Sequence, residues 1–290
     1  MTLTWTVVIA VLFGAVLHAG WNALVKSSGD KPLDTALVHF LGACLALPAL
    51  LVVGLPAAPA WPFIGLSLAT HIVYYVTLAG AYQHGDLGLT YPIMRGSAPL
   101  LVALGGAALL GEVPTVQAWA GVLAVTLGVA LVGLAHPGEA LHQRRAVLFA
   151  LGNAAVIATY TLIDGQGVRT TVAAGQGALS YVMVLFVLDG IPYPALVYWQ
   201  RDAAGRRGVL TYARRRWPLA ALGGAASMGS YAIALWAMTQ APVAVVSALR
   251  ETSVLFATAL SVWVLKERFG LQRAVGAVVI VLGVIVLRFS

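Results

Sequence analysis

Ten apolar runs, each long enough to cross a bilayer, follow one another along this sequence of 290 residues. Because a helix rises about 1.5 Å per residue, about 20 apolar residues span the hydrocarbon core. The runs lie at residues 4–26, 34–55, 62–83, 88–110, 114–135, 145–167, 174–199, 217–239, 243–265 and 270–289. The sequence therefore predicts an all-α integral membrane protein with ten transmembrane helices.

Charged residues are too scarce for a water-exposed surface. They make up 9% of the chain, against about 25% in a soluble domain. The first run lacks the basic segment and cleavage site of a signal peptide, so we expect it to be retained as a span. A single cysteine, Cys44, allows no intrachain disulfide.

The positive charges fall mainly on one side of the predicted membrane. Connections 1–2, 3–4, 5–6, 7–8 and 9–10 hold 13 Lys and Arg residues, whereas the opposite side holds only Arg169 and Arg288. By the positive-inside rule the first set is cytoplasmic, which places both termini in the periplasm of a bacterial inner membrane. This clustering between apolar runs is typical of a protein facing a lipid bilayer, and it argues against nucleic acid as a partner.

An internal repeat divides the chain. A displacement of 155 residues aligns two rare charged residues and two glycines without a gap: Arg95 with Arg250, Glu112 with Glu267, Gly121 with Gly276, and Gly128 with Gly283. Because each repeat holds five helices, an odd number, the second enters the membrane from the opposite side. We therefore predict two inverted five-helix repeats, residues 1–137 and 138–290, a plan that recurs in transporters with a central substrate site.

The same residues carry a family resemblance. The segment from Tyr91 to Pro99, followed by Gly111-Glu112, Gly121 and Gly128, resembles the half-repeat of the EamA family. The segment Leu265-Lys266-Glu267 with Gly276 and Gly283 resembles its second copy. The resemblance implies the drug/metabolite transporter superfamily, and within it bacterial exporters of amino acids, including aromatic ones. Other members of the superfamily move sugars, phosphates and nucleotide sugars.

Prolines distinguish the two repeats. Pro92 and Pro99 interrupt the backbone hydrogen bonds of the run 88–110, and we expect them to form a hinge. Ser247 and Val254 occupy the corresponding positions in the second repeat. The two copies of this helix are therefore not expected to bend alike.

Candidate substrate-binding residues are ring-bearing or polar side chains that share helix faces. Such a surface suits an amphipathic solute, although Trp and Tyr also form belts at the membrane interface. The candidates are His18, Trp21, Asn22, His71, Tyr75, Leu78, Tyr82, Tyr91, Arg95, Tyr160, Tyr231, Ser247, Arg250 and Glu251.

Arg95 and Arg250 each lie about two turns inside their predicted helices. A charge at that depth costs a few kcal/mol unless it faces protein or water. Arg95 is a candidate partner for a substrate carboxylate, and the alternative is that both side chains extend to the nearer interface.

Three acids, Asp164, Asp189 and Glu251, lie within apolar runs. Buried carboxyl groups can carry protons because burial disfavours their charged form. Hydrogen bonding to neighbouring helices is the structural alternative. Proton coupling and facilitated diffusion both remain open.

No motif indicates an enzyme. The sequence has no P-loop, no HExxH and no cysteine-rich metal site, so we predict no cofactor, no metal and no direct use of ATP. We expect a secondary transporter, an exporter of small amphipathic metabolites such as amino acids, working by alternating access. The alternatives are an exporter of another metabolite or drug class, a channel, and an integral-membrane enzyme.

Overall fold

The computed structural model describes residues 3–85, 87–133, 143–265 and 270–290. These residues form helices and no strand, and ten of the resulting segments are long and apolar enough to cross a membrane. The predicted fold class is confirmed. The predicted repeat boundary between residues 137 and 138, and the charges at Lys266 and Arg268, lie outside the described residues.

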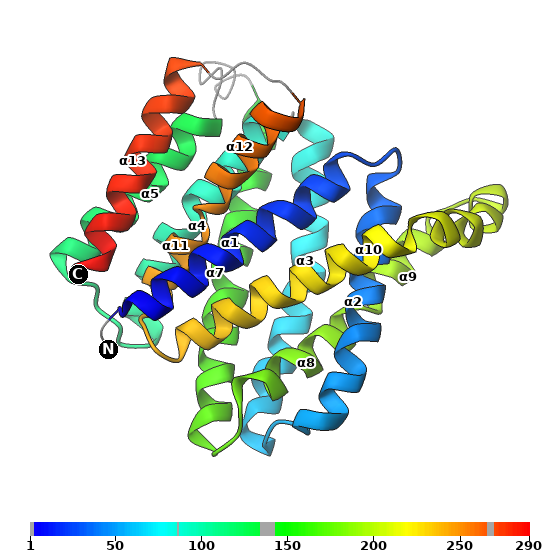
Figure 1. Ribbon diagram of the computed structural model, residues 1–290, viewed down its shortest axis with the longest axis horizontal. Coiled ribbons are helices and arrows are strands. Elements are labelled where there is room, and N and C mark those ends of the chain that lie inside the picture. Colours follow the sequence, from blue (N-terminus) through cyan, green and yellow to red (C-terminus); the bar gives the residue numbers. More distant parts are fainter. Residues whose placement is uncertain (1–2, 86, 134–142, 266–269) are drawn as a thin grey trace.

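The helices follow the predicted order. They are α1 (Trp5–Lys26), α2 (Lys31–Val53), the short 3-10 helix η1 (Ala58–Ala60), α3 (Trp61–His84), α4 (Leu87–Leu109), α5 (Val116–Gly133), α7 (Arg144–Ala173), α8 (Ala178–Asp189), α9 (Pro192–Trp199), α10 (Ala203–Met238), α11 (Val243–Arg250), α12 (Ser253–Leu265) and α13 (Leu271–Arg288). Figure 1 shows α13 beside α5 at one edge of the bundle, while α9 and the start of α10 extend away from the opposite edge.

Glycines pack α5 against α13 and reveal the direction of the repeats. A Cβ on Gly121 would lie 3.1 Å from the carbonyl oxygen of Gly283, and one on Gly128 would lie 2.8 Å from that of Gly276. As the chain advances along α5, its contacts therefore move backwards along α13. Because these two helices are equivalent in the two repeats and run antiparallel, the repeats are inverted. The remaining contacts agree, since α3 packs on α7 as α10 packs on α1.

The seventh span is two helices rather than the single helix expected over residues 174–199. α8 ends at Asp189 and α9 begins at Pro192. At the break, Gly190 approaches α2 so closely that a Cβ would lie 2.3 Å from the Cβ of Ala43. The proline at the start of α9 lacks an amide hydrogen, so it cannot continue the hydrogen bonds of α8.

The eighth membrane span, α10, begins fourteen residues before residue 217, the start expected from hydropathy. The Arg-rich segment, residues 201–216, was expected to form a polar connection, but α10 starts at Ala203. The Asp202 carboxylate caps this helix by accepting a hydrogen bond of 2.7 Å from the amide of Gly205. Ala and Arg favour helix, so the segment is helical although it is too polar to span a membrane.

The two copies of the fourth helix differ in the opposite way from that expected from their prolines. α4 runs through Pro92 and Pro99 as one helix. The proline-free copy is interrupted, with α11 ending at Arg250 and α12 beginning at Ser253. At the interruption the Thr252 hydroxyl donates a hydrogen bond of 2.7 Å to the carbonyl of Leu249, and this bond stabilises the turn. The hinge at the two prolines stays a prediction.

Candidate functional site

The interruption between α11 and α12 places Glu251 against α4. Its Oε2 lies 3.0 Å from Nε of Arg95, and the two side chains are only 4% and 11% exposed. The pair joins the two repeats inside the membrane region. Arg95, which the sequence made a candidate partner for a substrate carboxylate, is therefore paired with a carboxylate of the protein in this conformation.

This ion pair leaves polar atoms without hydrogen bonds. The Arg95 Nε and the Glu251 Oε2 are close but not aligned for a hydrogen bond, and Arg95 Nη2 is buried without a partner among the described residues. Trp21 Nε1 on α1 and Ser253 Oγ on α12 are also buried without a hydrogen-bond partner among the described residues, and these two helices pack together. Because buried polar atoms are normally paired, such a group indicates a place for a polar ligand or water.

Aromatic rings from three helices meet near this pair. The rings of His71 on α3 and Tyr160 on α7 are stacked with centroids 4.5 Å apart, and Tyr74 meets the Tyr160 ring edge-on at 6.1 Å. The guanidinium carbon of Arg250 lies 5.3 Å from the ring centre of Tyr231 on α10. Leu78 and Tyr91 pack in the same apolar cluster as Tyr160 and Tyr231.

Of the candidates on α1, His18 lies near the two arginines. His18 is close enough to Arg95 and Arg250 to be influenced by both charges, and its ring meets that of Trp21 edge-on at 5.5 Å. Asn22 instead donates a hydrogen bond of 2.7 Å to the backbone carbonyl of His18. Its amide nitrogen is therefore committed to its own helix.

Tyr75 belongs to a second polar cluster, with residues that the sequence analysis did not place together, and its ring also meets that of Tyr74 edge-on at 5.6 Å. Its hydroxyl lies 3.3 Å from both carboxylate oxygens of Asp189 on α8, and its ring lies 4.7 Å from that of Tyr193 on α9. His39 on α2 completes the cluster, with Nδ1 3.2 Å from the same carboxylate. Its neighbour Tyr74 is the ring that meets Tyr160.

Two further candidates lie at the limits of the site. Tyr82 on α3 is 41% exposed, as expected of a ring at a membrane interface. Ser247 on α11 is buried, one turn before Glu251. Asp164 forms the hydrogen bonds to neighbouring helices that were expected as its structural alternative: its carboxylate accepts them from Tyr181 and Tyr231, partners that the sequence did not indicate.

Ion pairs between helices also lie away from the arginine pair. Arg169 on α7 binds Glu112, in the connection between α4 and α5, at 2.6 Å. Arg216 on α10 binds Asp34 on α2. Neither pair could be read from the sequence, because their members are 57 and 182 residues apart.

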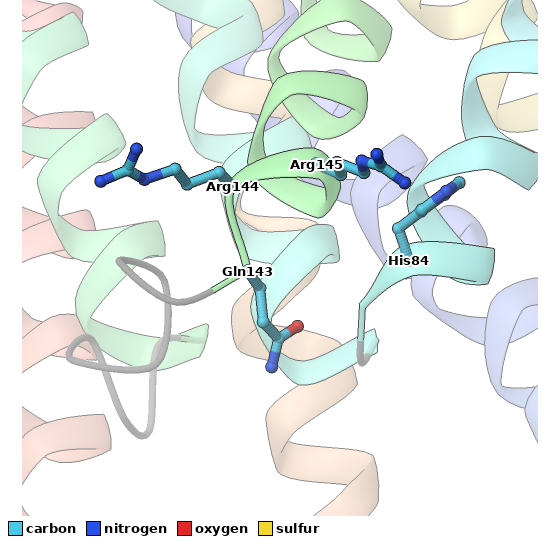
Figure 2. A pocket seen from close by; sticks show the side chains of 4 residues that line it. All are labelled: His84, Gln143, Arg144 and Arg145. Atoms are coloured by element: carbon cyan, nitrogen blue, oxygen red, sulfur yellow. The ribbon is translucent and has the colours of Figure 1, made fainter.

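A cavity of about 370 Å³ lies elsewhere, at the end of α3 and the start of α7. Figure 2 shows its lining residues, His84, Gln143, Arg144 and Arg145, with Arg144 pointing away from His84. None of the predicted site residues lines it, so it is distinct from the Arg95–Glu251 site. The described residues contain no cluster of His, Cys, Asp and Glu that could hold a metal ion.

Comparisons with known proteins address the whole chain. The sequence model of the EamA-like transporter family matches residues 5–134 and 144–289, one match in each repeat. None of the curated proteins that were compared matches the sequence. A solved crystal structure of a protein superposes with a TM-score of 0.77 at 19% identity, covering 98% of this chain and 96% of the other. At that identity the likeness shows the fold alone.

Proposed function

This chain belongs to the EamA-like transporter family, and we propose that it is a secondary transporter that exports small amphipathic metabolites, amino acids including aromatic ones foremost. The family is one of transporters, so a small-molecule substrate and a lipid bilayer are its partners. The substrate class, the direction and the mechanism are our proposals.

One observation carries the proposal: Arg95 faces Glu251 across the repeat interface, among unpaired polar atoms and aromatic rings. An amino acid carries a carboxylate and an ammonium group, and these match the two members of the pair. In our proposal the substrate carboxylate pairs with Arg95 and the substrate ammonium group pairs with Glu251. The substrate thus replaces the ion pair of the protein, and no charge is left unpaired inside the membrane. The stacked rings of His71 and Tyr160 offer an apolar face to its side chain.

The architecture supports our proposal of alternating access. The site lies between α4 of the first repeat and the broken α11–α12 segment of the second. Rocking of α3 and α4 against α10, α11 and α12 would open the site to each side in turn. The prolines of α4 and the interruption after Arg250 are the points at which these helices can bend.

We propose that the protein lies in the bacterial inner membrane with both termini in the periplasm. The support is the excess of Lys and Arg on the opposite side, and the charges described there include the helical Arg-rich start of α10. The start of α1 and the end of α13 lie on one side of the bundle in Figure 1, in keeping with an even number of spans.

The test is saturable transport by purified protein in liposomes. Uptake of radiolabelled amino acids should saturate as their concentration rises, and it should show counterflow. An open channel shows neither behaviour. Unlabelled amino acids, sugars and nucleotide sugars added as competitors will identify the substrate class. If only competitors of another class inhibit uptake, the amino-acid assignment is wrong.

Arg95→Ala tests the carboxylate contact. We expect at least a tenfold loss of uptake at low substrate, since hydrogen bonds to charged groups contribute about 1.5–3 kcal/mol. Arg144→Ala is the matched control, because that arginine is exposed at the start of α7 and remote from the site. Normal uptake by the Arg95 variant would refute the contact.

A further inference from the structure

Asp164 differs from the other enclosed carboxylates. Its side chain, within α7, is completely buried. In the described residues, the other buried or half-buried acids each pair with an arginine or a histidine. The paired acids are Asp30, Asp34, Glu112, Asp189 and Glu251. Within the described part of the chain, Asp164 forms no such ion pair.

Uncharged groups hold the Asp164 carboxylate from several helices. Tyr181 on α8 donates a hydrogen bond of 2.8 Å, and Tyr231 on α10 donates one of 2.5 Å. From α3, Ser67 is a polar neighbour, and His71 is near enough to act electrostatically. Arg250 on α11 lies over the ring of the same Tyr231, with its guanidinium carbon 5.3 Å from the ring centre.

This setting suits a group that gains and loses a proton. An ionised carboxylate without a counter-ion costs several kcal/mol in a buried site, and the two phenol donors offset part of that cost. When protonated, the carboxyl donates one hydrogen bond and still accepts another, and a phenol oxygen can accept in turn. Both states therefore keep Asp164 hydrogen-bonded.

The same residues connect Asp164 to the substrate site. Tyr231 binds Asp164 through its hydroxyl and lies under Arg250 through its ring. Glu251, next to Arg250 in the chain, pairs with Arg95. Counting these four charges, Arg95 and Arg250 give +2 and Glu251 gives −1, so the site sums to zero with Asp164 ionised and to +1 with it protonated. The proton on Asp164 therefore changes the charge that a substrate meets.

We propose that Asp164 is a proton-binding site that couples substrate transport to proton movement. The carboxylate takes a proton from water on the side to which the site is open and releases it to water on the other side. This inference rests on the proposed transport function, because it assigns the coupling ion of that transporter.

The experiment records substrate and proton fluxes together in liposomes that contain a pH-sensitive dye. The substrate is the compound that wild-type protein carries best in the competition experiment. Wild-type transport should move protons in a fixed ratio, and a pH gradient should drive accumulation of substrate. Asp164→Asn should retain substrate counterflow but lose at least tenfold in proton flux. Asp202→Asn, an exposed cap that asparagine can also provide, should behave as wild type.

Three results would overturn the proposal. They are wild-type substrate flux without proton flux, accumulation driven by sodium alone, and uncoupling by Asp189→Asn but not by Asp164→Asn. Absence of any substrate flux would instead refute the proposed function. Infrared spectroscopy of wild-type protein in bilayers needs no substrate: a protonated-carboxyl band should appear as pH falls and be missing in Asp164→Asn. Absence of that difference would also refute the site.

Discussion

Arg169 and Glu112 should stabilise the side of the bundle where α4, α7 and α10 end. The Arg169 guanidinium contacts Glu112 at 2.6 Å and donates hydrogen bonds of 2.7 and 3.1 Å to the carbonyls of Met238 and Ala241. The second oxygen of Glu112 accepts a hydrogen bond of 2.9 Å from the amide of Val243, the first residue of α11. Two side chains thus connect three segments of both repeats.

The structure sets the size of the expected loss. The Arg169 and Glu112 side chains are 16% and 17% exposed, between the surface pairs that contribute about 0–1 kcal/mol and the buried pairs that cost about 3–5 kcal/mol when broken. Arg169→Ala should therefore lower the free energy of unfolding by about 2–3 kcal/mol. Glu112→Gln should cost about 1–2 kcal/mol, because glutamine keeps an oxygen for the amide of Val243 while it loses the charge.

The assay is a double-mutant cycle measured by unfolding in mixed detergent micelles and followed by circular dichroism. The double variant should lose at least about 1 kcal/mol less than the sum of the single losses, because the shared ion pair can be lost only once. Arg207→Ala is the control, since that side chain is exposed and donates its hydrogen bond to the carbonyl of Ala203 in its own helix, and it should change stability by less than about 0.5 kcal/mol. Additive losses, or an unchanged Arg169 variant, would refute the reasoning.

Three further predictions use the same preparations. Gly128→Ala should destabilise the protein by about 1–3 kcal/mol, because the added Cβ would lie 2.8 Å from backbone atoms of α13. Gly152→Ala is the control, because its Cβ would meet no atom within 4 Å, and melting curves in detergent compare the two variants. Asp34→Asn should lower the melting temperature because it leaves Arg216 without its ion-pair partner, and equal melting of variant and wild type would contradict this. Glu251→Gln should raise KM for amino acids about tenfold, equivalent to about 1.4 kcal/mol, and saturable uptake measures it.

The number of membrane spans and the direction of the repeats were predictable because they depend on local or regular features. Apolar length defines a span independently of its neighbours, and an odd number of spans per repeat fixes the inversion. The glycines Gly121 and Gly276 could be recognised as equivalent because they occur in register. Their contacts with Gly283 and Gly128 give the inversion a physical basis in the packing of α5 and α13.

The start of α10 and the break after Arg250 could not be predicted from hydropathy. A polar helix outside the hydrocarbon has no apolar run, so residues 203–216 gave no signal of a span. The break at Glu251 and Thr252 contains neither glycine nor proline, the residues that usually mark one. The interruption depends on packing between repeats, and so does the contact of Glu251 with Arg95 that it allows.

Sequence symmetry and site chemistry diverge at one pair of positions. Arg95 and Arg250 are equivalent, but the residue after Arg95 is Gly96 and the residue after Arg250 is Glu251. Gly96 faces α5, where a Cβ would lie 3.5 Å from a backbone oxygen, so that position serves packing. The acid exists in the second repeat alone and neutralises the arginine of the first, which leaves Arg250 to the ring of Tyr231. A symmetric scaffold with one acid and two arginines therefore gives a site that holds both signs of charge, the feature on which the proposed binding of an amino acid depends.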